Sequence, residues 1–335
     1  MIYRCQDYKP DLLEKAGYYE GVPIEQIFPP VDEKLEAHRT KRFAAPFVGV
    51  PFDRIDVDPI IIAHACVVLG YTNRDFYENP PLGAKCVIYC NELYDLLPVT
   101  HWFYSNVWLD ALGCKMIVTE SLPWIVQEPR PVQKPEDVDK IDVPDVSDME
   151  KCLTGELFIK CYDWVKEHEP QFFVPISYGF CHFGMAAEMV GPERFIIWCR
   201  RQKDVAHKLL SKVIETSANG AIMIARRYGF CMMTIGSVLS NSTVLSGKMN
   251  KEFAANYIIQ MVKKAFKGGA GPQLWYHLCG DHQFDYMNFK EMVISPFTVI
   301  HIGYLGDQPF PADLLRETFG NMMTVMASVD TKIMM

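Results

Sequence analysis

The sequence predicts a (β/α) barrel, and two observations lead to this prediction. Short apolar segments of strand length alternate with longer stretches of helical spacing along most of the chain, which is the pattern of parallel βα units. The predicted strands are also continuous hydrophobic runs, as expected for strands that are covered on both faces. In a barrel, helices cover the outside of the strands and packed side chains fill the interior, so this architecture explains both observations.

Seven segments have the length and composition of such strands. The first, residues 55–62, follows a polar amphipathic stretch at residues 31–47. The others lie at residues 114–119, 172–177, 230–235, 273–278, 297–302 and 323–329. A closed (β/α)8 TIM barrel needs eight strands. Either one strand escapes this interpretation, or the last βα unit is absent from this chain.

Helical spacing between these strands predicts helices at residues 203–228, 251–267 and 312–319. The acidic, proline-rich residues 127–148 resemble a domain linker in composition. Neither flank alone contains a complete set of strands, so we interpret this segment as a long surface connection. The sequence therefore predicts one barrel domain over residues 1–335, with residues 1–50 as an N-terminal helical extension.

The composition excludes several classes of protein. With 33 lysines and arginines against 41 aspartates and glutamates, the chain has a net charge of −8, which argues against nucleic acid as a partner. The longest apolar run, residues 59–70, contains His64 and is shorter than the ~20 residues of a membrane span. The 11 cysteines show no paired spacing, and no apolar leader is present. We expect a soluble protein of the reducing cytoplasm.

The most informative short segment is His277-Leu278-Cys279-Gly280, at the end of a predicted strand. In an extended chain, residues i and i+2 project to the same face about 6.5 Å apart. The imidazole of His277 and the thiolate of Cys279 can therefore converge on one zinc ion. Catalytic groups lie at the carboxyl ends of the strands in this architecture. The alternative is a hydrogen-bonded histidine beside a buried cysteine.

A catalytic zinc takes three protein ligands, so a third must come from elsewhere. His301 ends the next predicted strand and is our candidate for this ligand. Cys181 and His182 follow another strand, and His282 lies on the turn after Cys279. Cys231 is discounted because it lies near the start of its strand, the end of a barrel that usually concerns stability.

The aromatic segment at residues 98–106 could line a ligand pocket, although a plain core is the more common outcome for such a cluster. From it we take His101 and Tyr104 as candidate substrate-binding residues, together with His182. Glu188, within a helical stretch, is interpreted as a surface or capping carboxylate.

Several segments together resemble one known family. Residues 108–114, WLDALGC, continue through Leu122-Pro123 to Val138 and are similar to the "EALGC … P … edl" region of the uroporphyrinogen decarboxylase superfamily. Further similar segments, in the same order as in that superfamily, are Asp53 to Ile55 ("DRvPv"), Gly179 to Gly191 ("GpftlA…l.G"), His277 to Gly280 ("H.CG") and Ser328 to Asp330 ("GNvDp"). The resemblance implies a (β/α)8 barrel.

The superfamily contains decarboxylases and zinc-dependent, corrinoid-linked methyltransferases. The decarboxylases have an N-terminal "RQAGR" segment and an aspartate that grips the tetrapyrrole. This chain lacks the former and has no acidic residue between Asp95 and Asp110, where the latter should fall. The methyltransferases share the His-x-Cys pair, so the resemblance implies that His277 and Cys279 bind zinc.

The family commonly supplies its third zinc ligand as a cysteine after the "GNvDp" strand, whereas this sequence ends five residues after Asp330. The resemblance thus implies that the terminal βα unit is absent, or that His301 or another residue substitutes.

We expect a methyltransferase that acts with a separate corrinoid-binding protein, because the chain lacks a cobalamin-binding Asp-x-His-x-x-Gly segment. Aromatic residues near strand ends favour a small methoxylated, aromatic methyl donor, with cob(I)alamin as the acceptor. The alternatives are transfer from a methylcorrinoid to coenzyme M or another thiol, uroporphyrinogen decarboxylation, and a non-catalytic barrel relative. The oligomeric state stays open, with a homodimer among the options.

Overall fold

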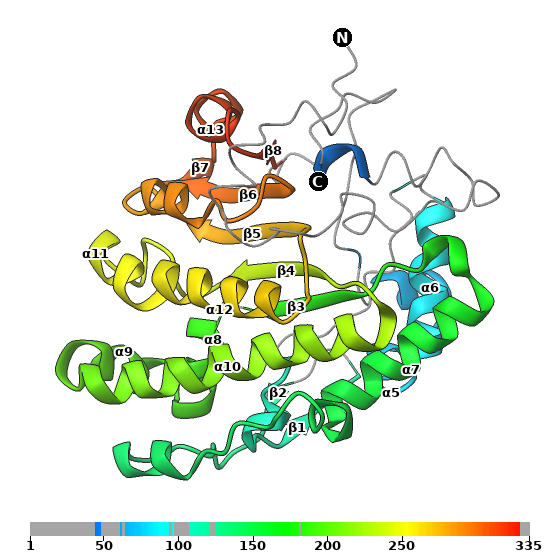
Figure 1. The fold of residues 1–335 in the computed structure, drawn as a ribbon, viewed down its shortest axis with the longest axis horizontal. Coiled ribbons are helices and arrows are strands. Elements are labelled where there is room, and N and C mark those ends of the chain that lie inside the picture. The colour runs from blue at the N-terminus through cyan, green and yellow to red at the C-terminus, as the bar shows by residue number, and fades with distance from the viewer. Residues whose placement is uncertain are drawn as a thin grey trace.

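A computed structural model describes residues 44–47, 61, 64–93, 96, 107–120, 125–180 and 182–328 of the chain. Its centre is a wall of parallel strands formed by successive βα units (Figure 1). In spatial order these strands are β3 (Ile176–Phe180), β4 (Met232–Ser237), β5 (Leu274–Asp281), β6 (Thr298–Leu305) and β8 (Thr324–Met326). The order follows the sequence, as it does in a barrel wall.

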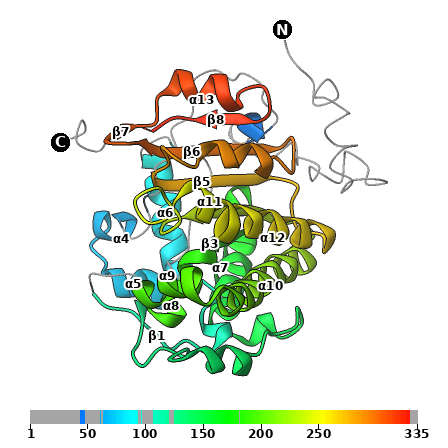
Figure 2. The ribbon, with the colours of Figure 1, turned by 90° about the vertical axis from the view of Figure 1, so that its left-hand side faces the viewer.

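The strands are buried because helices pack against this wall. All six residues of β4 are buried, as expected for a parallel strand covered on both faces. The long helix α10 (Lys203–Tyr228) connects β3 to β4, and α12 (Asn256–Lys267) connects β4 to β5. The two helices pack side by side in both views (Figures 1 and 2). Helix α10 ends where Gly229 adopts a left-handed conformation, with φ of +81°.

The remaining elements complete the connections around the wall. Helices α8 (His182–Val190) and α9 (Pro192–Arg201) follow β3, α11 (Gly247–Asn250) and a π-helical turn (Lys251–Ala255) precede α12, and a 3₁₀ segment (Tyr286–Met292) follows β5. The short strand β7 (Gln308–Pro309) folds back antiparallel on the end of β6, and α13 (Ala312–Phe319) leads to β8.

Helices lie before the wall in the chain as well. They are α4 (His64–Val68), α5 (Asn73–Glu78), α6 (Pro80–Leu93) and α7 (Leu153–His168). Thr72 begins α5 with a capping box, in which its side chain accepts from Asp75 N and the Asp75 carboxylate accepts from Thr72 N. Residues 44–47 form one further helical turn.

The WLDALGC segment forms a packing joint between two helices. Trp108 is fully buried with φ of +67°, and its backbone N–H donates to Thr154 Oγ1 at 3.1 Å. Asp110, in the 3₁₀ turn Asp110–Leu112, accepts from the Thr154 backbone N–H at 2.9 Å. The Trp108 ring lies against Gly220, where a Cβ atom would come within 2.4 Å of it. The segment therefore joins the start of α7 to α10.

The prediction that residues 114–119 form a strand of the parallel wall is wrong. Only Met116–Ile117 form a strand, β1, which pairs antiparallel with β2 (Ile125–Val126) in a separate two-stranded sheet. Both β1 residues are partly or fully exposed, so their apolar character does not mark a strand covered on both faces. An apolar run of strand length does not specify which strand it pairs with.

The other predicted elements are shifted at their ends. The strand expected at residues 172–177 runs from Ile176 to Phe180, because a 3₁₀ turn (Pro170–Phe172) and Pro175 precede it. The helix expected at residues 251–267 opens with the π-helical turn, whereas the helices at residues 203–228 and 312–319 are confirmed to the residue. Residues 127–148 include the 3₁₀ turn Pro135–Lys140 and bury Val132 and Val138, so they pack on the domain.

Two predictions lie largely outside the described residues. Only Ile61 is described in the first predicted strand, and only residues 44–47 in the expected N-terminal helical extension. In the part of the chain that the structure describes, no helix combines the length and the hydropathy that crossing a membrane requires.

Candidate metal and methyl-transfer site

The predicted metal ligands lie toward the carboxyl end of β5. Along this strand, the fully buried Tyr276 and Leu278 alternate with the half-buried His277 and Cys279. The alternation places His277 and Cys279 on the less covered face, because successive side chains of a strand project to opposite sides. Tyr276 projects the other way, and its hydroxyl donates to the Met292 carbonyl at 2.9 Å. Tyr276 is therefore not part of an aromatic lining around His277.

His301 on β6 is the directly paired neighbour of His277. The two imidazole rings stack with centroids 4.7 Å apart and an interplanar angle of 12°. On the other side, the partner of His277 on β4 is Gly236, which places no side chain next to the imidazole. The edge of the Trp275 ring faces the His277 ring at 6.1 Å.

The stacked geometry decides how the two histidines could bind a metal. The lone pair of an imidazole nitrogen lies in the plane of the ring, so nearly parallel rings direct their lone pairs side by side. One ring must turn before both nitrogens can bind the same ion. Consistently, among the described residues no group of three or more His, Cys, Asp or Glu side chains is placed to hold a metal ion.

His301 is held in its neutral form. Burial lowers the pKa of His301 to about 3, because desolvation disfavours the imidazolium, and the nearby His277 and His282 lower it further. Its Nδ1 atom is buried and has no hydrogen-bond partner among the residues that the structure describes. Neutral imidazole is the form that binds metals, so protons do not compete for this side chain near neutral pH.

Gly280 allows the chain to change direction directly after Cys279. Its φ is +84°, and the pairing with β6 shifts register between Leu278 and Asp281. A Cβ atom at Gly280 would lie 2.6 Å from Asn241 Nδ2, and one at Gly303 would lie 3.0 Å from the Gly280 backbone. The glycine of the His-x-Cys-Gly segment is thus required by backbone conformation and by close packing.

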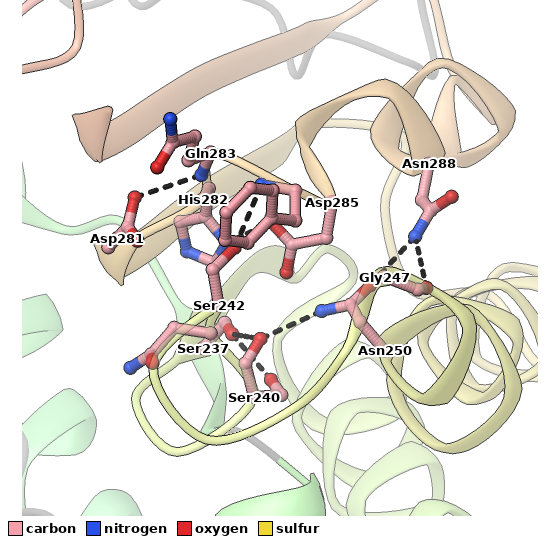
Figure 3. Close-up of polar contacts among 12 residues, drawn as sticks. Ser237, Ser240, Ser242, Gly247, Asn250, Asp281, His282, Gln283, Asp285 and Asn288 are labelled. Atoms are coloured by element: carbon pink, nitrogen blue, oxygen red, sulfur yellow. Dashed lines mark hydrogen bonds and ion pairs between the residues drawn. The ribbon is translucent and has the colours of Figure 1, made fainter. Parts of the chain in front are cut away.

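A buried polar network follows the end of β5 (Figure 3). His282 places Nε2 2.9 Å from the Cys279 carbonyl oxygen and Nδ1 3.0 Å from Asp285 Oδ1. Asp285 also accepts from the Ser242 hydroxyl at 3.3 Å. The Ser242 backbone N–H donates to the Asp281 carbonyl at 2.7 Å. His282 therefore lies on the turn predicted for it, but its nitrogens bond to protein oxygens.

The other candidate residues are less closely tied to this site. His182 is fully buried at the start of α8, where burial lowers its pKa to about 4, and its ring packs 6.0 Å from that of Tyr257 on α12. Its predicted role in substrate binding stays a prediction. His101, Tyr104 and Cys181 lie outside the described residues.

Two further interpretations concern residues away from the strand ends. Cys231 is fully buried just before β4, as expected for a structural cysteine. Glu188 accepts from Arg130 Nη1 at 3.0 Å, and its backbone carbonyl accepts from the same guanidinium at 2.6 Å. The partly buried Glu188 carboxylate therefore pairs with a cation, and its interpretation as a surface or capping carboxylate stays a prediction.

Sequence reasoning missed Asn241, which packs against Gly280, and the network residues Ser242 and Asp285. A signal for one of them exists, since Asp285 follows His282 by three residues just past a strand end. The two loop residues after β4 carry no such signal, because they meet β5 only in the folded chain.

The fold and the strand-end imidazole and thiol define a barrel protein with a candidate metal site at its carboxyl face. The family model for uroporphyrinogen decarboxylase (URO-D) matches residues 38–335, and the chain belongs to this family. The predicted TIM-barrel class is thereby confirmed. Among solved structures, the chain is similar to a methyltransferase from Methanosarcina mazei, with 16% identity, a TM-score of 0.64, and coverage of 86% of this chain and 91% of that chain. A search of curated proteins found no match.

Proposed function

We propose that the protein is a zinc-dependent methyltransferase that moves a methyl group between a small methoxylated compound and the cobalt of a separate corrinoid protein. The observation that carries this proposal is the placement of His277 and Cys279 on one half-buried face near the carboxyl end of β5. Membership of the URO-D family and the similarity in fold to a methyltransferase support it.

The residues present suit zinc in their chemistry. Imidazole nitrogen and thiolate sulfur are preferred zinc donors, and a catalytic site takes three protein ligands and leaves one position open. His277 and Cys279 would supply two of them. His301 is neutral, and its buried Nδ1 has no hydrogen-bond partner within the described part of the chain. It would supply the third ligand after its ring turns out of the stack with His277.

Bound zinc would act as a Lewis acid that withdraws charge from the ether oxygen of a methyl donor or lowers the pKa of an acceptor thiol. The chain's own residues would position the reacting group. Gly236, the residue paired with His277 on β4, carries no side chain, and the Trp275 ring lies near the His277 ring, with centroids 6.1 Å apart. The corrinoid partner would approach at the carboxyl ends of the strands, where active sites of this architecture open.

An aromatic methyl donor remains the favoured substrate because of the segment around His101 and Tyr104. Trp275, which shares its face of β5 with His277, adds an aromatic side chain next to the candidate site.

The test combines metal analysis with a methyl-transfer assay. Purified protein should contain about one zinc per chain, and Cys279→Ala should remove the zinc without unfolding the protein. Under anaerobic conditions, a panel of methoxylated aromatic compounds should convert added cob(I)alamin to methylcobalamin in the visible spectrum. Cys231→Ala, a buried cysteine at the opposite end of the neighbouring strand, is the matched control and should keep both zinc and activity.

The same assay separates the alternatives. Methylcobalamin consumed in the presence of coenzyme M, with no reaction of methoxylated compounds, would establish transfer to a thiol. Turnover of uroporphyrinogen without metal would establish a decarboxylase. Zinc-free protein without any of these activities would leave a non-catalytic barrel.

A further inference from the structure

We propose that His282 and Asp285 form a clamp that fixes the backbone at Cys279 and thereby directs the Cys279 side chain toward the metal position. This inference rests on the proposed function, and it assigns positioning roles to two residues that touch neither metal nor substrate. We call this pair the β5 clamp.

His282 contacts the backbone carbonyl of Cys279 through Nε2. A carbonyl oxygen only accepts, so the His282 nitrogen 2.9 Å away, Nε2, must carry a proton and donate it. This bond acts on the main chain of the very residue whose sulfur is the proposed ligand. It lies beside Gly280, the position in this strand end that has the left-handed backbone conformation.

His282 is itself held in place by β6 and by Asp285. Its backbone N–H donates to the Tyr304 carbonyl of β6 at 3.0 Å, and its Nδ1 meets Asp285 Oδ1 at 3.0 Å. The ring edge of Phe289 packs on the imidazole, with centroids 5.1 Å apart. His282 thus ties the end of β5 to β6, the strand that carries His301.

Both residues of the β5 clamp are buried. The side chains of His282 and Asp285 are both 0% exposed, so water does not compete for their hydrogen bonds. The second carboxylate oxygen of Asp285, Oδ2, is buried and accepts no hydrogen bond from any described residue. A carboxyl group left half satisfied in the interior opposes folding, and such groups are often retained for a functional reason. Holding His282 in one orientation supplies that reason.

The clamp needs two hydrogen bonds on His282 and does not need a charge on Asp285. An asparagine at position 285 could donate its amide N–H to Nδ1 while Nε2 still donates to Cys279. Asp285→Asn is therefore a conservative variant that keeps the geometry. His282→Phe keeps the ring and its packing on Phe289 but removes both bonds.

The experiment titrates the zinc-free full-length protein with Co²⁺ and records the absorption spectrum, in which thiolate-to-cobalt charge transfer reports the Cys279 sulfur. We expect His282→Phe to weaken Co²⁺ binding roughly 10- to 100-fold, as the loss of a residue that hydrogen-bonds to a metal ligand does, and to shift or reduce the charge-transfer band. Asp285→Asn should bind within about threefold of the unaltered protein, because its hydrogen bonds persist. His207→Phe, the matched control on α10, should leave the spectrum unchanged.

Each outcome decides between supporting and rejecting the clamp. If His282→Phe does not fold, Asp285→Ala takes its place, and it should give the same loss, whereas Asp285→Asn does not. Unaltered Co²⁺ affinity and spectrum in a folded clamp variant would overturn the clamp and leave the zinc proposal standing.

Failure of the unaltered protein to bind Co²⁺ would reject the zinc proposal instead. The clamp is then judged by the rate at which iodoacetamide alkylates Cys279, measured by mass spectrometry of the Cys279 peptide. His282→Phe should change this rate several-fold relative to His207→Phe, and equal rates would overturn the clamp.

Discussion

His277 on β5 and His301 on β6 are directly paired across the sheet, and their rings stack 4.7 Å apart at an angle of 12°. This pairing brings together two histidines that are 24 positions apart in the chain. It also keeps their lone pairs from converging until one ring turns. Substitution of His301 can therefore show whether this residue binds the metal or only packs beside His277.

We expect His301→Ala to weaken zinc binding by more than about 100-fold, because losing a direct ligand should cost more than the roughly 10- to 100-fold loss caused by removing a residue that hydrogen-bonds to a ligand. Competition with a chelator of known affinity measures this change. His168→Ala, an exposed histidine on α7, is the control and should leave zinc affinity as it is. A loss of less than about threefold in His301→Ala would mean that another group completes the site.

Gly280→Ala should destabilise the protein because it imposes a left-handed backbone on a residue with a side chain and directs a Cβ atom at Asn241. The conformation alone costs about 1–2 kcal/mol in the free energy of unfolding. Gly229→Ala, with φ of +81° and open space around the Cβ position, is the matched control for that cost. Urea denaturation should show a larger loss for Gly280→Ala. Equal losses of stability at the two positions would show that Asn241 moves away from the added Cβ atom at no cost in free energy.

Gly220→Ala tests the packing joint at Trp108. In the middle of a helix this change usually stabilises by about 1 kcal/mol. In α10 we expect net destabilisation, since the added Cβ would lie 2.4 Å from the Trp108 ring. Thermal and urea unfolding measure the sign of the change. In a protein that already carries Trp108→Phe, adding Gly220→Ala should cost less stability than it does in the unaltered protein. A Gly220→Ala variant that is more stable than the unaltered protein would contradict the contact between Trp108 and Gly220.

His182 should make the stability of the protein depend on acid pH. Burial lowers its pKa from 6.5 to about 4 in the folded state, so below pH 6.5 the unfolded chain binds the proton more readily. The free energy of unfolding should therefore fall as pH drops from about 6.5 to about 4, by roughly 3 kcal/mol in total at 1.36 kcal/mol per pKa unit. Urea denaturation at several pH values should show a shallower decline for His182→Phe. An identical decline in both proteins would assign the effect to other groups.

The sequence could predict elements whose limits are set locally. Helix α10 ends at Gly229, whose left-handed conformation is a local property of glycine, and α13 lies between Pro311 and Gly320. The π-helical turn at Lys251–Ala255 could not be predicted, because helical periodicity does not distinguish it from an α-helix. The apolar segment at Met116 likewise could not reveal that its partner is Ile125–Val126.

In the candidate site, too, some features could be predicted from the sequence and others could not. The spacing of His277 and Cys279 within one strand predicts their shared face, and the position of His301 at the end of the next strand predicts its proximity. Ring orientation could not be predicted, since it depends on packing across the sheet. The role of Asp285 depends on a turn that brings it back to His282, so it too required the structure.

The most direct measurement of the central claim is X-ray absorption at the zinc edge of the purified protein and of Cys279→Ser. We expect about one zinc per chain, with a sulfur at about 2.3 Å and nitrogens at about 2.0–2.1 Å, and loss of the sulfur contribution in the variant. A zinc-free protein, or a spectrum that does not change when Cys279 is replaced, would contradict that claim.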